Sequence, residues 1–215
     1  IETQILPRAQ FAVDLHSGGT RSIYTPCAYV YAFGSEAFRK RKLAAIHAFG
    51  LPHTTVVAAT SSGGSLSAAC ERHNVVMVAT ELGGGALLDG RAMDLGYDGT
   101  RALLCHAGVL AGDVEGRRTS LIHVESRRSS VTSNIDGMFE HAVDVGDDVV
   151  AGQIAGQVWP MDDLAREPVV VKCALAGTVL ARRATPLVLA GDTVCHTGRR
   201  ISDDEFLSIG NGDRS

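Results

Sequence analysis

Residues Phe11–Gly19 and Val75–Gly85 share one pattern: an apolar strand leads to charged side chains and then to a glycine-rich turn. Strand side chains alternate between the two faces, so Asp14 and His16 share a face at the end of the first stretch. Glu81 occupies the equivalent place in the second stretch. Because open α/β sheets form their ligand crevices at the carboxyl ends of strands, we predict that His16 and Glu81 belong to one site.

The first half of the chain alternates between strand and helix patterns, which predicts an α/β layer with a mostly parallel sheet over residues 1–115. Ser35 is a favourable N-cap, and Gly50 is a favourable stop, for a helix between them. A second helix is expected to begin at Asp98. The remaining expected elements are strands at 11–16, 23–33, 54–60 and 75–80 and a helix at 66–73. Of two interpretations of Ser61–Ser65, a solvated linker is favoured over a mobile loop near a site.

The pattern changes near Gly112, where the helical period gives way to short Val-, Ile- and Thr-rich segments separated by turns. Regularly spaced strands of this kind predict a small all-β domain, a sandwich or a barrel, over residues 116–201. Residues 202–215 are polar and rich in Gly and Asp, so they are expected to form a flexible tail.

The composition of the 215 residues excludes several classes of function. Hydrophobic residues make up 45% of the chain, and the formal net charge is -4. A globular protein that binds neither nucleic acid nor membranes is therefore expected, and the Arg39–Lys42 charge run is predicted to be the solvated face of a helix. The five cysteines form no CxxC pair, which favours a reducing cytoplasm over a disulfide framework.

Two interpretations remain open for each candidate residue. His16 is either a hydrogen-bonded structural residue or a metal ligand, with Asp14 fixing its ring from the second coordination shell or serving as a satisfied buried group. Glu81 is either a general base whose pKa burial raises, or a carboxylate paired with Arg21 or Arg91. The small residues of the two turns are expected to shape the pocket around this site: Ser17, Gly18, Gly19, Gly83 and Gly84.

The segments Val13–Gly19 and Thr80–Gly85, followed by Val145–Ile154, resemble the succinylglutamate desuccinylase/aspartoacylase family of zinc amidohydrolases. The resemblance implies a zinc-carboxypeptidase-like mostly parallel sheet with helices, followed by a β barrel-sandwich domain. It further implies one Zn²⁺ per active site, with His16 as its third protein ligand and Glu81 as general base and proton shuttle. The glycine tracts are most similar to those of the N-acetyl-diaminobutyrate deacetylase branch, which serves ectoine degradation, so the substrate is expected to be a small N-acyl amino acid.

The chain departs from the family pattern in one respect, because the upstream His-x-x-Glu ligands and a substrate-binding Arg have no counterpart here. We therefore expect the carboxyl-terminal portion of a family member, with an incomplete catalytic domain that binds zinc poorly and lacks catalysis by itself. The alternatives are an inactive scaffold and a carrier module built on the β domain. A carrier needs a modifiable Lys at a hairpin tip, whereas Lys172 lies within a predicted strand. A homo-oligomer is compatible with the sequence.

Overall fold

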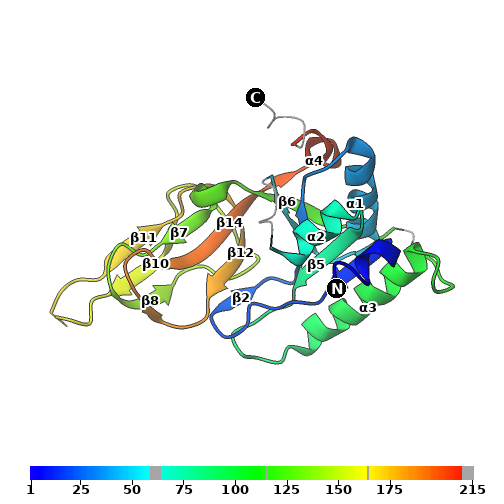
Figure 1. The fold of residues 1–215 in the computed structure, drawn as a ribbon. Coiled ribbons are helices and arrows are strands. Elements are labelled where there is room, and N and C mark those ends of the chain that lie inside the picture. The colour runs from blue at the N-terminus through cyan, green and yellow to red at the C-terminus, as the bar shows by residue number, and fades with distance from the viewer. Residues whose placement is uncertain (59–63, 115, 164, 210–215) are drawn as a thin grey trace.

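The computed structural model describes residues 1–58, 64–114, 116–163 and 165–209, apart from the side chains of residues 126 and 127. The linker predicted at Ser61–Ser65 therefore lies largely outside the described residues. Two halves are visible in Figure 1: one half carries the longer helices, the other is built of strands, and β14 runs between them.

The helical half is built on a mostly parallel sheet whose strands lie in the order β1-β5-β3-β4-β6. The pairs β1–β5, β3–β4 and β4–β6 are parallel, whereas β3 and β5 are antiparallel. This confirms the predicted α/β class with a mostly parallel sheet. The strands are β1 (Phe11–Asp14), β3 (Cys27–Tyr31), β4 (His53–Val57), β5 (Val76–Glu81) and β6 (Ser120–Val124).

Helices cover both faces of this sheet. α1, α3 and α4 pack on one face around a core that includes Val30, Ile46 and Val78, and α2 packs on the other face with Cys70 and Met77. The helical elements are η1 (Leu6–Arg8), α1 (Glu36–Phe49), α2 (Leu66–Arg72), α3 (Gly90–His106), η2 (Ser126–Ser129) and α4 (Asp203–Ile209). Among the described residues we find no helix with the length and apolar content that crossing a membrane requires.

The predicted ends of α1 are confirmed. The Ser35 hydroxyl accepts a hydrogen bond from the Phe38 amide at 3.2 Å, and Gly50 ends the helix with a left-handed φ of 72°. The predicted start of α3 at Asp98 is wrong, because Asp89 caps this helix by accepting from the Arg91 amide at 2.9 Å. Asp98 lies inside the helix.

The charge run on α1 is a solvated face only in part: Lys40 is exposed, but the prediction is wrong for two of the four residues. Arg39 and Lys42 are 1% and 4% exposed. Arg39 donates to the Leu207 carbonyl in α4 at 2.8 Å, and Lys42 forms an ion pair with Glu71 of α2 at 2.9 Å. These buried cations connect α1 to elements on both faces, and their hydrogen bonds satisfy charges that would otherwise be costly to bury.

The strand-rich half consists of two layers around one apolar core that includes Phe139, Val158 and Val194. One layer is a sheet in the order β11-β10-β8-β13, and the other contains β2, β7, β9, β12 and β14. The strands are β2 (Ser22–Tyr24), β7 (Ser130–Thr132), β8 (Gly137–His141), β9 (Asp148–Val149), β10 (Ile154–Trp159), β11 (Val169–Lys172), β12 (Gly177–Arg183), β13 (Leu187–Val188) and β14 (Thr193–Ile201).

Two strands connect the halves, so the predicted division at residue 115 is wrong by one strand. β6, which we assigned to the β domain, pairs in parallel with β4 of the first sheet. β14 pairs with β12 and then, through Arg199–Ile201, with β6. β2 connects the halves a second time, because it belongs to the first half of the chain and pairs with β12.

The predicted flexible tail is wrong for the residues that the structure describes. Asp203–Ile209 form α4, and Phe206 is fully buried against α1 and the first sheet. The remainder of the predicted tail, residues 210–215, lies outside the described residues. Phe206, with Leu207 and Ile209 beside it, therefore packs this helix onto the core.

Stability is expected to fall as the pH is lowered from about 8 to about 5.5. Burial lowers the pKa values of four histidines in the folded protein. Below their unfolded pKa these histidines are protonated more readily in the unfolded chain than in the folded protein. Acidification therefore shifts the equilibrium toward the unfolded state. The measurement is the urea midpoint at both pH values. The variant His196→Gln should weaken this dependence, whereas His73→Gln, near the surface, should leave it intact. A urea midpoint that is the same at both pH values would contradict the prediction. The four histidines are His53, His123, His141 and His196.

Candidate active site

The two predicted residues lie at the same edge of the sheet. β1 and β5 are parallel with Asp14 opposite Ala79, so their carboxyl ends emerge together with His16 and Glu81 in the next register position on the same face. The backbone holds them there, since the Leu82 amide donates to the His16 carbonyl at 2.8 Å. The His16 amide donates to the Thr80 hydroxyl at 3.1 Å.

The His16 ring is oriented by Asp14. Its Nδ1 lies 3.4 Å from Asp14 Oδ1, and the imidazole is 65% exposed. A carboxylate at Nδ1 favours the tautomer in which Nε2 is unprotonated and available as a ligand. This arrangement corresponds to the metal-ligand interpretation of His16 and leaves Asp14 partly exposed.

Glu81 has an unpartnered carboxylate oxygen, because Oε2 is buried and makes no hydrogen bond within the part of the chain that the structure describes. Burial raises the pKa of this carboxyl, His16 lowers it, and Asp14 raises it further. No described contact joins Glu81 to Arg21 or Arg91, which removes the basis for the ion-pair interpretation. A carboxylate with a raised pKa is suited to accept and return a proton near neutral pH.

Several neighbours of Glu81 were missed from the sequence. Cys27 lies opposite Glu81, and Tyr29 lies opposite Ala79, on the antiparallel strand β3. The charge of Glu81 contributes to raised pKa values of Tyr24 and Tyr29. Burial raises the pKa of the Cys27 thiol to about 12, so this thiol is not a nucleophile at neutral pH. Only the β3–β5 pairing could have revealed these neighbours, and strand periodicity does not encode that pairing.

The glycines of the two turns pack the turns against each other. The Gly18 and Tyr24 amides both donate to the Gly83 carbonyl, at 3.1 and 3.2 Å. A Cβ on Gly84 would lie 2.1 Å from the Ser22 carbonyl oxygen.

Gly19 and Gly83 have a different role, because their positive φ values of 61° and 72° are accessible to glycine while nothing crowds them. Ser17 is exposed, and its hydroxyl accepts from the Gly19 amide at 3.4 Å. The turns thus fix the backbone on both sides of the candidate site.

The donor set fits one position of a zinc site. His16 offers a free imidazole nitrogen with a carboxylate behind it, which is the usual arrangement of a zinc-bound histidine. Within the described residues, however, no group of three or more His, Cys, Asp or Glu side chains is placed to hold a metal ion. A catalytic zinc normally has three protein ligands, so His16 accounts for part of such a set.

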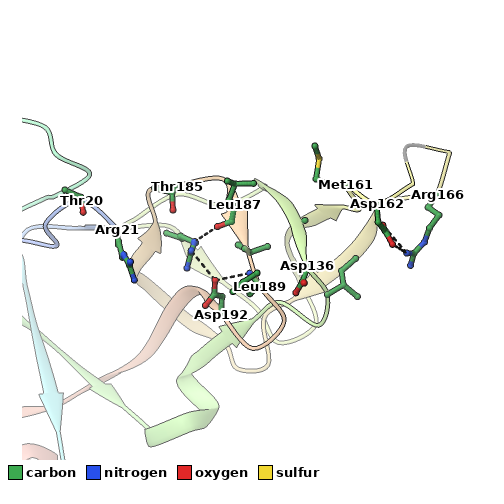
Figure 2. Close-up of a pocket in the computed structure, with 14 residues that line it drawn as sticks. Thr20, Arg21, Asp136, Met161, Asp162, Arg166, Thr185, Leu187, Leu189 and Asp192 are labelled. Carbon is green, nitrogen blue, oxygen red and sulfur yellow. Dashed lines mark hydrogen bonds and ion pairs between the residues drawn. The ribbon is translucent and has the colours of Figure 1, made fainter.

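A groove of about 1010 Å³ lies away from this site, in the strand-rich half (Figure 2). Thr20 and Arg21 stand at one end, and the ion pair between Asp162 and Arg166, at 3.2 Å, stands at the other. Neither His16 nor Glu81 lines it. This groove is therefore separate from the candidate site at the carboxyl ends of β1 and β5.

The fold consists of an α/β half with a mostly parallel sheet joined to a strand-rich half, and comparisons with known proteins agree with it. Residues 1–107 match the succinylglutamate desuccinylase/aspartoacylase catalytic domain. The chain superimposes on a succinylglutamate desuccinylase/aspartoacylase from Rhodobacter sphaeroides with a TM-score of 0.87 and 28% identity, covering 94% of this chain and 61% of that one. The chain belongs to the succinylglutamate desuccinylase/aspartoacylase family.

Two relatives have more specific names. The chain is 29% identical over 192 residues to the N-alpha-acetyl-L-2,4-diaminobutyric acid deacetylase of Halomonas elongata, covering 88% of this chain and 56% of that protein. The product-bound ectoine utilization protein EutE (DoeB) from Ruegeria pomeroyi superimposes with a TM-score of 0.86 and 33% identity, covering 92% of this chain and 60% of that one. The chain thus spans a little over half the length of these relatives.

Proposed function

We propose that this chain carries part of the active site of a zinc-dependent deacylase that hydrolyses the amide bond of a small N-acyl amino acid. The observation that carries the proposal is that an imidazole oriented by Asp14 lies at the same edge of the sheet as Glu81, whose Oε2 is buried and makes no hydrogen bond to a described group. Family membership and the names of the relatives support the same reaction.

Each residue has a distinct role in this proposal. His16 would hold Zn²⁺ through Nε2, and Asp14 would keep the ring in the tautomer that permits this. When bound, the metal would supply a Lewis acid that polarises the acyl carbonyl and acidifies water. Glu81 accepts the proton of the attacking water and returns it to the leaving amine, which requires the raised carboxyl pKa that its burial provides.

The substrate that we propose is N-acetyl-2,4-diaminobutyrate, and the setting is the degradation of ectoine. Both are drawn from the relatives, of which one is a diaminobutyrate deacetylase and another an ectoine utilization protein. Because the chain spans a little over half of these relatives, we propose that residues outside it complete the zinc ligands.

The β half is proposed to be a barrel-sandwich domain that supports the site. A carrier function is less favoured, because Lys172 lies within β11 and pairs with Ile154 in the sheet. A carrier lysine needs a hairpin tip, where a modifying enzyme can reach it. Absence of modification at Lys172 by mass spectrometry would agree with this assignment.

The experiment that tests the proposal measures zinc content and amide hydrolysis together in the protein that contains this chain. His16→Ala should lose zinc and activity, and Asp14→Asn should weaken zinc binding by about 10- to 100-fold, because the ring loses its orienting carboxylate. His73→Ala, where the side chain lies 3.8 Å from the Glu2 carboxylate, is the matched control. Full activity after zinc removal, or normal zinc content in His16→Ala, would refute the assignment.

A further inference from the structure

A second hollow adjoins the groove of the strand-rich half at the Arg21 end. Its volume is about 210 Å³, and it is lined by Arg21 and by residues of β2, β12 and β14. Arg21 and Arg183 line both the hollow and the groove. Backbone pairing holds them side by side, because the Ala184 amide donates to the Arg21 carbonyl at 2.8 Å and Ser22 pairs with Arg183. The two spaces therefore meet at these two arginines.

The hollow presents cations and no carboxylate. Arg21, Arg182 and Arg183 line it, and no Asp or Glu of the described residues does. Two of these arginines already hold carboxylates: Arg182 pairs with Asp144 at 2.7 Å, and Arg183 pairs with Asp192 at 3.1 Å. The Arg21 side chain is exposed and has no partner within the described part of the chain. A planar guanidinium matches a carboxylate in geometry and charge, so Arg21 is suited to bind one.

His196 and Thr193 add neutral hydrogen-bond donors to the same hollow. Burial lowers the pKa of His196, so its ring is neutral at pH 7. The Ser130 hydroxyl lies 3.1 Å from Nδ1 of His196, and when Ser130 donates this hydrogen bond the ring hydrogen is on Nε2. An anion in the hollow therefore meets donors from two strands besides Arg21.

The groove beyond the arginines is lined by apolar side chains that the fold leaves uncovered. Leu187, Leu189 and Met161 are each more than half exposed. Leu187 and Leu189 follow the arginine end of the groove, and Met161 lies further along it (Figure 2). At the far end Asp162 and Arg166 pair with each other at 3.2 Å. Covering these apolar side chains with an aliphatic chain would remove their surface from water, which is favourable.

We infer that the hollow and the groove form one binding site for an aliphatic carboxylate, with its head group at Arg21 and its chain along Leu187 and Leu189. The reverse orientation is disfavoured, because three Asp side chains line the groove and oppose an anion there. Each buried methylene group strengthens binding, so a chain of about ten carbons should bind far more tightly than acetate. Neither His16 nor Glu81 lines either space, so the inference does not depend on the proposed function.

Calorimetric titration of the protein that contains this chain tests the inference with four probes: decanoate, decanol, decyltrimethylammonium and acetate. Decanoate should bind at a single site, about 10-fold or more tightly than decanol, with the cation weakest of the three long-chain probes. Acetate should bind about 100-fold or more weakly than decanoate. Equal affinities for decanoate and decanol, tighter binding of the cation, an acetate affinity equal to that of decanoate, or no binding of decanoate overturns the inference.

Substitution then locates the bound carboxylate. Arg21→Gln should weaken decanoate binding about 10-fold and leave decanol binding unchanged, whereas Leu187→Ser should weaken both. Arg91→Gln and Leu88→Ser, at exposed positions of the helical half, are the matched controls. His16→Ala should bind decanoate like the wild type. Loss of binding in His16→Ala, or full binding in Arg21→Gln, places the carboxylate elsewhere and overturns the inference. Melting temperatures identify a misfolded variant, for which the wild-type comparison of probes remains decisive.

Discussion

Replacing Glu81 by Gln is expected to lower kcat for amide hydrolysis by about 100- to 10,000-fold in the protein that contains this chain. An amide has nearly the same shape as the carboxylate but cannot accept a proton from water. Because Oε2 of Glu81 makes no hydrogen bond to any described group, the exchange breaks no internal hydrogen bond at that oxygen. The measurement is the steady-state rate of acetate release at saturating N-acetyl-2,4-diaminobutyrate.

Zinc content and melting temperature should stay near the wild-type values in this variant, since Glu81 is assigned to proton transfer and not to the metal. Glu167→Gln, on an exposed loop of the strand-rich half, makes the same chemical change away from the site. A Glu81→Gln protein that keeps its rate would exclude the general-base role. Loss of zinc in the same variant would instead make Glu81 a ligand.

Replacing Phe206 by Ala is expected to destabilise the fold by about 3–5 kcal/mol. The ring is fully buried where α4 meets α1 and the first sheet, so its loss removes apolar contacts and leaves a cavity. The measurement is the free energy of unfolding from urea denaturation. Arg39 donates to the Leu207 carbonyl in the same helix, so the variant should also weaken this hydrogen bond of the buried cation.

Phe33→Ala is the matched control, because the same truncation at a side chain that is 42% exposed should cost far less. If the two variants unfold at the same denaturant concentration, α4 does not contribute to the core. The predicted contrast also distinguishes a docked helix from the flexible tail that the polar sequence suggested.

Some residues of the candidate site are predictable from the sequence alone, and others are not. His16 and Glu81 were found because each follows an apolar strand and precedes glycines, and parallel strands bring such ends to one edge. Their neighbour Tyr29 was not found, because its place beside Glu81 depends on the antiparallel pairing of β3 with β5. The same limit explains β6, whose Val- and Ile-rich pattern fits either half of the chain, and which the β4 pairing assigns to the first sheet.

The sequence by itself determined the α/β class, the ends of α1 and the two strand ends that carry His16 and Glu81, since periodicity, helix caps and glycine turns are local properties. Tertiary structure alone decided that Arg39 and Lys42 are buried, that α4 docks through Phe206, and that β14 pairs with both β6 and β12 and so joins the two halves. The physical reason is that burial and strand partners depend on which distant segments meet. A charged or polar run is expected to be solvated when only the sequence is known, because the carbonyl or carboxylate that can satisfy its charges after burial lies far along the chain.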